Sequence, residues 1–177
     1  GAIILPHGVL FRGHKEAGIR RELVRRGLIK GIIGLPANLF YGTGIPACIV
    51  VIDKENAQAR KAIFMVDASM DFIKDSNKNR LRSQDIHKIV DVFSHLTEVP
   101  GYARMVPLSE IANEANDYNL NLPRYIDNSQ EEDLHDLHAH LNGGIPNVDI
   151  DALEAYWKVF PKLRKTRFRN NGRKGYS

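Results

Sequence analysis

The chain has 177 residues, of which 43% are hydrophobic, and this length and composition suit one domain with a hydrophobic core. Its single cysteine, Cys48, excludes an internal disulfide and lies in an apolar run, so we expect a buried thiol and a reducing, cytoplasmic location. No apolar run reaches about 18 residues and no secretory signal pattern occurs, so we expect no membrane association.

Four apolar runs in the first part of the chain predict β-strands. They are Ala2–Leu5, Ile29–Leu35, Ala47–Ile52 and Lys61–Val66. Between the first two, His14–Arg26 has the apolar spacing of an amphipathic helix, which Gly27 ends. This order is typical of α/β folds. The connection 36–46 has only eleven residues and no helical pattern, so we expect the strands on either side of it to be antiparallel neighbours.

After Val66 the sequence predicts mainly helices. Lys74–Arg82 is polar and basic and is expected to be an exposed loop, whereas Asn116–Asp127 is expected to be an extended polar–aromatic segment. The expected helices are Ser83–Leu96, Pro107–Asn113, Ser129 to about Leu141, and one that Asp149 or Asp151 caps and that runs to Phe160. We divide the chain into 1–68, a continuation of the same domain at 69–128, and C-terminal helices with a basic tail at 129–177.

Three stretches of the chain, taken together, resemble one protein family. They are PHGVLFRG at 6–13, GIIGLPANLFYGTGIPACIVVIDK at 31–54 and NDYNLNLPRYID at 116–127. In this order, and over Ala2 to Asp127, they are similar to the modification subunit of type I restriction–modification systems. Members of that family are adenine-N6 DNA methyltransferases that use S-adenosylmethionine, and they work with a specificity subunit and a restriction subunit. The resemblance therefore implies DNA and these two subunits as partners.

The resemblance also implies what this chain lacks. The family binds its cofactor at an aromatic–x–Gly–x–Gly loop after the first strand of its sheet and carries out its chemistry at an Asn-Pro-Pro-Phe/Tyr loop. No Asn-Pro pair occurs here, and Gly42-Thr43-Gly44 neither follows the first strand of a unit nor opens a helix, so it is not expected to be the cofactor loop. We expect the C-terminal half of a Rossmann-like class I S-adenosylmethionine-dependent methyltransferase sheet, followed by a mainly helical region. Ala2–Leu5, Ile29–Leu35 and Ala47–Ile52 would be its fifth, sixth and antiparallel seventh strands.

This expectation has consequences for activity and assembly. The chain is expected to be inactive alone and to bind no cofactor by itself. The alternative is a non-enzymatic module that docks on the specificity subunit or on DNA. Because the chain begins within the apolar run Ala2–Leu5, an unpaired strand edge is also expected, with self-association through that edge or a frayed N-terminus.

The connection 36–46 is the candidate site for the target base. Methylation of adenine in a duplex requires the base to leave the stack, and flipped bases are held between flat side chains. In related adenine methyltransferases the loop between the sixth and seventh strands supplies one wall, so Phe40 or Tyr41 is the stacking candidate. The whole predicted site is Asn38, Phe40, Tyr41, Gly42, Thr43 and Gly44. The alternative is that Phe40 is a core residue and that the glycines only make a turn, for which they permit positive φ.

Basic residues gather in two places, although the net charge is only +4. The first is the early helix, with Lys15, Arg20, Arg21, Arg25 and Arg26, which either contacts phosphate or simply covers the sheet. The second is the C-terminal tail, which from Lys165 onward is expected to be mobile and to contact nucleic acid or a partner, or only to aid solubility. Its candidate contacts are Arg164, Lys165, Arg167, Arg169, Arg173 and Lys174.

Two further clusters are assigned no chemistry. The segment Asn116–Tyr125 contains Asn and Asp, but these residues favour turns and its apolar members can anchor it, so a structural role is preferred over subunit or DNA contact. His135, His138 and His140 lie close together, yet they are expected to form a solvated face and not a metal site.

Overall fold

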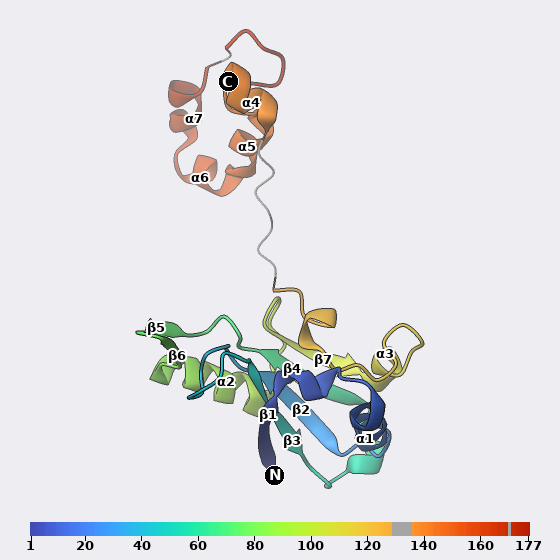
Figure 1. Ribbon diagram of the computed structural model, residues 1–177. Helices are drawn as coiled ribbons and strands as arrows, with labels where there is room; N and C mark the ends of the chain where they lie inside the picture. Colours follow the sequence, from blue (N-terminus) through green and yellow to red (C-terminus); the bar gives the residue numbers. More distant parts are fainter. Residues whose placement is uncertain (129–135, 170) are drawn as a thin grey trace. The chain divides into compact units, whose positions relative to one another are not determined.

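The structure is a computed structural model that describes residues 1–128, 136–169 and 171–177. It divides into two units, Gly1–Ser129 and Gln130–Ser177, and each is described by itself (Figure 1). In the described residues, no helix has both the length and the apolar character that crossing a membrane requires.

The first unit is built on a five-stranded mixed sheet with the order β1-β3-β2-β4-β7. Its strands are β1 (Ala2–Pro6), β2 (Ile29–Gly34), β3 (Ala47–Ile52), β4 (Ala62–Asp67) and β7 (Ala103–Pro107). Strand β3 is antiparallel to both of its neighbours, with Ile49 opposite Ile4 on one side and Ile33 on the other. The predicted antiparallel pairing across 36–46 is therefore confirmed. Strand β4 is parallel to β2, and β7 was not predicted.

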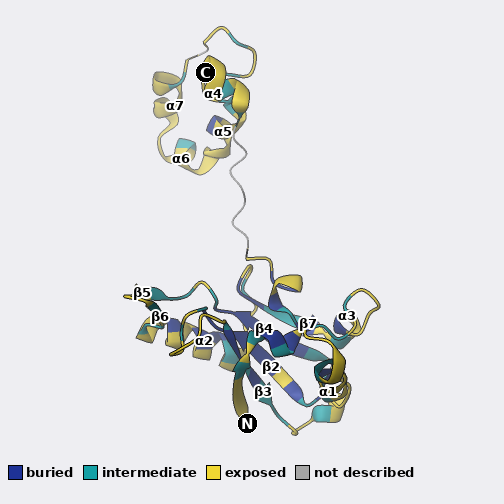
Figure 2. Cartoon of the chain, in the orientation of Figure 1, coloured by how far each residue is buried: buried dark blue, intermediate teal, exposed yellow. Residues whose placement is uncertain are grey.

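Both faces of this sheet are covered, which explains why its central strands are continuous apolar runs. On one face, Ile32 and Met65 pack with Val24 of α1 (His14–Arg25). On the other face, Phe64 packs with Ile89 of α2 (Ser83–His95). Figure 2 shows the buried residues concentrated along the sheet. Cys48 is buried as expected, and burial raises the pKa of its thiol to about 11.

A buried arginine joins the first and third sequence motifs. Arg20 of α1 is only 7% exposed, and its guanidinium donates to the carbonyl oxygens of Tyr118, Val9 and Arg12 at 2.7, 3.0 and 3.0 Å. Burial lowers the pKa of Arg20, and the nearby Glu16 carboxylate opposes that shift. Arg20 therefore has a structural role and is not free to contact phosphate, whereas Lys15, Arg25 and Arg26 are exposed, so both expectations for this helix stay open.

The third motif packs as a structural segment around short turns. Leu120 and Leu122 are each 1% exposed, and the amide of Leu120 donates to the carbonyl of Leu10 at 2.9 Å. A side chain at Gly34 of β2 would meet Leu122 at 2.4 Å, so this glycine permits the close approach. The short 3-10 helices of the unit are η1 (His7–Leu10), η2 (Ala57–Ala59) and η3 (Leu122–Arg124).

The segment Lys74–Arg82 is not a simple loop, so that prediction is wrong. It contains a two-stranded hairpin, β5 (Ile73–Asp75) and β6 (Lys78–Arg80), whose polar sequence hides the strand pattern. Ser83, where a helix is expected to begin, is the first residue of α2. Arg82 is the N-cap, and its backbone amide donates to the Asp85 carboxylate at 2.8 Å. The predicted helix at 107–113 is shorter, α3 (Leu108–Ile111).

The second unit is a set of short helices with few buried residues. They are α4 (Leu137–Asn142), α5 (Asn147–Ala152), α6 (Glu154–Val159) and α7 (Pro161–Arg167). The expected helix start at Ser129 lies outside the described residues. The single helix expected from Asp149 or Asp151 to Phe160 is wrong, because two short helices, α5 and α6, occupy that stretch and Pro146 is the N-cap of α5.

The C-terminus is folded onto its own unit, so the expected mobile tail is wrong. The amide of Ile145 donates to the carbonyl of Ser177 at 2.7 Å, and the reverse bond is 3.0 Å. The hydroxyl of Tyr176 donates to the Asp136 carboxylate at 2.8 Å, and this carboxylate also caps α4 by accepting from the amide of Ala139. Both hydrogen bonds stabilise the charged carboxylate and so lower the pKa of Asp136.

Candidate functional site

The connection between β2 and β3 forms an exposed loop at one end of the sheet. The amide of Leu35 donates to the carbonyl of Ala47 at 2.9 Å and closes its base, while Pro36 is buried. Asn38 has φ of 56° and Gly42 has φ of 77°, so both adopt left-handed conformations. Gly44 does not, contrary to expectation, and its lack of a side chain matters because a Cβ there would lie 3.0 Å from the Asn38 Oδ1. This loop, residues 36–46, is the β2–β3 loop.

The two aromatic residues of the β2–β3 loop have different surroundings. Phe40 is 37% exposed and lies where two apolar hollows meet, each of which Ile4 of β1 also lines. Tyr41 is 90% exposed. Phe40 is therefore partly buried at the edge of the sheet, which agrees with neither a core residue nor a fully exposed one. The ring of Tyr41 is exposed to solvent. Thr43 accepts from the amide of Ile45 at 3.1 Å and shapes the return of the loop.

The β5–β6 hairpin lies against this loop, a contact that the sequence interpretation missed (Figure 1). The backbone amide of Asn79 donates to the carbonyl of Asn38 at 2.9 Å, and its side-chain Nδ2 donates to the carbonyl of Ala37 at 2.7 Å. The Lys78 ammonium lies over the ring of Tyr41. The only sequence signal was the basic, polar composition of the hairpin, which does not identify its partner.

Two titratable residues that were not predicted lie near the same end of the sheet. His7 follows β1, and its amide donates to the carbonyl of Pro46 at 2.9 Å. Burial lowers the pKa of His7, and the negative charge of Asp67 opposes that shift. Asp67, at the end of β4, is 6% exposed and accepts from the amide of Ser69 at 3.0 Å and from the Asn128 side chain at 2.7 Å. Because its carboxylate is paired, Asp67 braces this end of the sheet.

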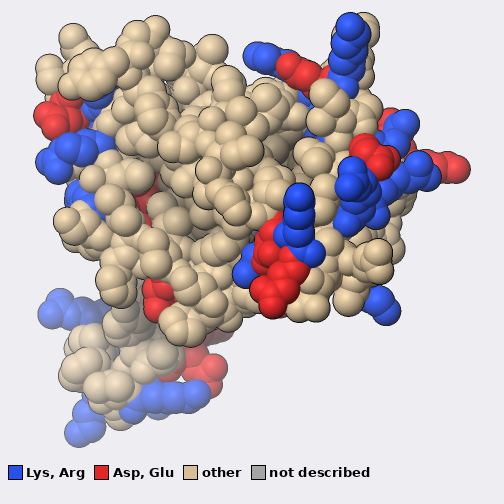
Figure 3. Space-filling view, turned by 90° about the horizontal axis from the view of Figure 1, so that it is seen from below, with Lys and Arg blue, Asp and Glu red and all other residues tan. Residues whose placement is uncertain are grey.

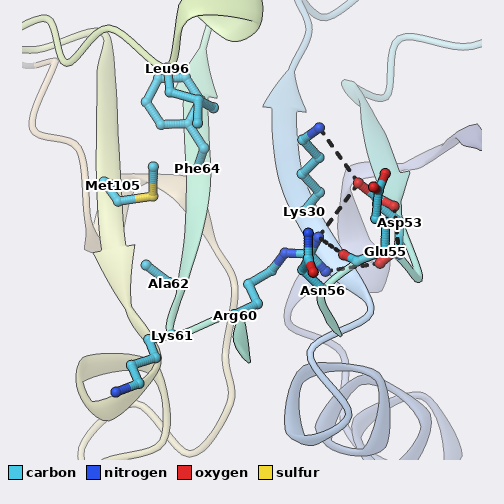
Figure 4. Close-up of a pocket in the computed structure, with 10 residues that line it drawn as sticks. All are labelled: Lys30, Asp53, Glu55, Asn56, Arg60, Lys61, Ala62, Phe64, Leu96 and Met105. Atoms are coloured by element: carbon cyan, nitrogen blue, oxygen red, sulfur yellow. Dashed lines mark hydrogen bonds and ion pairs between the residues drawn. The ribbon is translucent and has the colours of Figure 1, made fainter. Parts of the chain in front are cut away.

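The opposite end of the sheet holds a polar hollow of about 520 Å³ (Figure 4). Arg60 crosses it and donates to the carbonyls of Gly27, Asp53 and Glu55. The Asp53 carboxylate also lies 3.5 Å from Lys30. The Asp53 carboxylate therefore pairs with Lys30 and Arg60, and these contacts brace the turns that surround the hollow.

The predicted basic contacts of the C-terminal region are only partly available. Arg164 pairs with Asp151, and Arg173 lies over the ring of Tyr176 at 4.2 Å. Lys165, Arg167, Arg169 and Lys174 are exposed. In the described part of the chain, no group of three or more His, Cys, Asp or Glu side chains could hold a metal ion, and His135 lies outside the described residues.

Comparisons with known proteins agree on one family. Residues 1–134 match the model described as N-6 DNA Methylase. The chain is 40% identical over 143 residues to the MjaVII type I restriction enzyme methylase subunit of Methanocaldococcus jannaschii, covering 78% of this chain and 24% of that protein. The MpnII methylase subunit of Mycoplasma pneumoniae is 35% identical over 147 residues, covering 83% and 26%.

The structural comparison points the same way. A type I restriction–modification methyltransferase subunit from Streptococcus thermophilus is 40% identical with a TM-score of 0.64, over 71% of this chain and 26% of that chain. This chain therefore spans about a quarter of the length of the relatives that it matches.

Proposed function

The chain belongs to the N-6 DNA methylase family, and we propose that it forms the C-terminal half of the catalytic domain of a type I modification subunit that methylates adenine N6 in DNA. One observation carries this proposal. The β2–β3 loop, whose sequence prompted the base-wall hypothesis, holds Phe40 and Tyr41 at an exposed end of the sheet. A flat side chain held there can stack on a base that has left the duplex.

Strand order supports the proposed place of this chain in the catalytic domain. β1, β2 and β3 would be the fifth, sixth and seventh strands of a class I methyltransferase sheet. In such a sheet the seventh strand is antiparallel and lies between the fifth and sixth, and β3 has that position and direction here. The strand on the far side of β1 would then belong to the other half of the domain.

Two features of the described residues argue against a binding site for S-adenosylmethionine in this chain. Gly42-Thr43-Gly44 leads into strand β3 and not into a helix, so it does not form the loop and helix N-terminus that bind nucleotide-like cofactors. The buried carboxylate at the end of β4, Asp67, already accepts from Ser69 and Asn128. We propose that the cofactor and the catalytic Asn-Pro-Pro loop belong to the rest of the parent protein and that this chain alone is inactive.

The outer side of β1 fits the missing half of such a domain. Ile3 and Ile4 are 51% and 57% exposed on an edge strand. Apolar hollows flank this edge on both faces, one beside Ile19 of α1 and one beside Val90 of α2. Figure 3, which views the chain from below Figure 1, shows a broad uncharged area with mixed acidic and basic side chains beside it. In the isolated chain we expect self-association through this edge.

The second unit is the proposed contact with the specificity subunit. Its helices expose apolar side chains that a folded monomer would ordinarily cover, namely Leu137, Leu141, Val148, Tyr156, Val159 and Phe160. The exposed Lys165, Arg167, Arg169 and Lys174 make DNA the second candidate for this surface. Contact with the restriction subunit is proposed from the family alone.

Substitutions in the β2–β3 loop test the proposed function in a complete subunit assembled with its specificity subunit. Phe40→Ala and Tyr41→Ala should each lower methyl transfer to unmethylated DNA by about fivefold or more, since base–aromatic stacking contributes about 1–3 kcal/mol. Binding of S-adenosylmethionine, measured by calorimetry, should not change. Tyr41→Phe keeps the ring and is the matched control. If both alanine variants keep full turnover, the loop is not a wall of the base pocket.

A further inference from the structure

The β5–β6 hairpin is tied to the arm of the β2–β3 loop that leads to the two aromatic residues. Asn79 makes both ties, one from its backbone amide to Asn38 and one from its side-chain Nδ2 to Ala37. The two acceptor carbonyls come shortly before Phe40 in the chain, so the ties act on the backbone that sets where its ring lies. The other arm is held separately, where the amide of His7 donates to the carbonyl of Pro46.

A second contact reaches the tip of the loop. The Nζ of Lys78 is buried and has no hydrogen-bond partner among the described residues, and it lies over the exposed ring of Tyr41. An ammonium over a tyrosine ring is a favourable cation–π contact, worth more as the cation loses water. Lys78 and Asn79 are adjacent in β6, so a single short strand contacts both the base of the arm and the second aromatic residue.

Apart from these ties, the arm is held by Leu39, which packs against the core cluster on the α2 face of the sheet. Asn38 adopts the left-handed conformation, which asparagine tolerates better than other residues with a side chain, so this position can exchange with other backbone conformations when it is not held. An exposed loop also gains backbone entropy when it is released. The Nδ2 of Asn79 therefore offsets a real tendency of this segment to adopt other conformations.

We propose that the β5–β6 hairpin is the positioning element of the base-contacting loop, with Asn79 as the positioning residue and Lys78 as the support for Tyr41. Asn79 itself touches no substrate. It pre-organises the backbone so that Phe40 and Tyr41 stand where a flipped adenine can stack on them. That the loop contacts a base rests on the proposed function. That the hairpin holds the loop does not depend on it.

The first experiment measures how the loop is held in the 177-residue chain, by hydrogen exchange of two loop amides: that of residue 79, which donates to the carbonyl of Asn38, and that of Ile45, which donates to Thr43. Asn79→Ala and the nearly isosteric Asn79→Asp both remove the donor to Ala37, and each should speed exchange there about five- to tenfold, the factor for one lost hydrogen bond. Asn77→Ala is the matched control, because Asn77 is exposed in the turn of the same hairpin. It should change exchange less than twofold.

The amides of Ile32 and Ile33 in β2 are the internal reference. If they speed up as much as the loop amides, Asn79 stabilises the whole sheet and the proposal is wrong. If the loop amides are unchanged in both Asn79 variants, the proposal is also wrong. Lys78→Met keeps the apolar stem without the charge, and should move the Tyr41 ring resonances toward those of a free tyrosine. Unmoved resonances would remove Lys78 from the proposal.

The second experiment asks whether the positioning matters for DNA. In a complete subunit with its specificity subunit, Asn79→Asp should lower kcat/KM for DNA about fivefold and leave KM for S-adenosylmethionine unchanged. Asn77→Ala should match wild type. A change in both parameters would indicate a general structural defect and would contradict a positioning role. If Phe40→Ala has no effect on methylation, the proposed function fails, while the exchange measurement still decides whether the hairpin holds the loop.

Discussion

The two units of this chain differ in how completely they bury their apolar residues. In the first unit a sheet covered on both faces buries a continuous core, with Phe64 and Met65 at 0% exposure. In the described residues of the second unit, Ile150 is the only buried hydrophobic side chain, at 3% exposure. The first unit therefore has an internal source of stability, except along the outer side of β1. The second unit depends on polar contacts and, in our proposal, on a partner.

The largest expected effect tests the core of the first unit. Phe64→Ala would leave a cavity between the sheet and α2, and should lower the free energy of unfolding by about 3–5 kcal/mol. Phe160→Ala removes a ring that is 57% exposed in the second unit and should cost less than about 1 kcal/mol. Chemical denaturation followed by circular dichroism measures both. If both variants lose the same free energy of unfolding, the two units do not differ in how much their apolar side chains stabilise them.

The next effect concerns the buried Arg20. Arg20→Met keeps much of its volume but leaves the carbonyls of Tyr118, Val9 and Arg12 without this donor. We expect a loss of about 2–3 kcal/mol, because unsatisfied buried polar groups keep their desolvation cost. Arg25→Met on the exposed side of the same helix is the control. Denaturation midpoints that coincide for the two variants would show that Arg20 does not hold the motifs together.

The exposed edge of β1 gives a third, concentration-dependent effect. A charge at Ile4 should oppose strand pairing and packing against the neighbouring apolar hollow. Ile4→Lys should weaken self-association of the isolated chain about tenfold, equivalent to about 1.4 kcal/mol. Met70→Lys, at a residue that is 72% exposed in the first unit, is the control. Sedimentation velocity over a range of concentrations measures it. A wild-type chain that stays monomeric throughout would contradict the exposed-edge account.

The smallest effect is the pH dependence of the second unit. The pKa of Asp136 is lowered in the folded state by the amide of Ala139 and the hydroxyl of Tyr176. A lowered carboxyl pKa stabilises the fold above the ordinary carboxyl pKa, and that stabilisation is lost as the pH falls through the folded value, below about 4. Amide protection in α4 should therefore fall in acid, and Tyr176→Phe should weaken the dependence. Protection in α4 that is constant across this range would contradict the assignment.

Local patterns predicted much of the sheet. The apolar runs located β1 to β4, and the short connection 36–46 predicted the antiparallel pairing of β2 and β3. Strand β7 was missed because its five residues contain an arginine and end at Pro107, which gives no clear apolar run. The β5–β6 hairpin was missed for a similar reason, since its exposed strands are polar.

Contacts between distant segments could not be predicted in the same way. The spacing of Arg20 on its helix is compatible with a solvated position, and it is buried because the 116–127 segment and the turn after β1 both pack beside α1. The loop residues Phe40 and Tyr41 were identified as candidates by resemblance. Their support by Asn79 and Lys78, about forty residues away in the chain, appears only when the hairpin and loop lie together.

The central claim is that this chain supplies a base-contacting loop while the cofactor site lies in the rest of the parent protein. Isothermal titration of S-adenosylmethionine into the 177-residue chain and into a complete subunit tests it most directly. The account predicts saturable binding by the complete subunit and no binding heat for the chain alone. Binding by the chain with an affinity close to that of the complete subunit would contradict it.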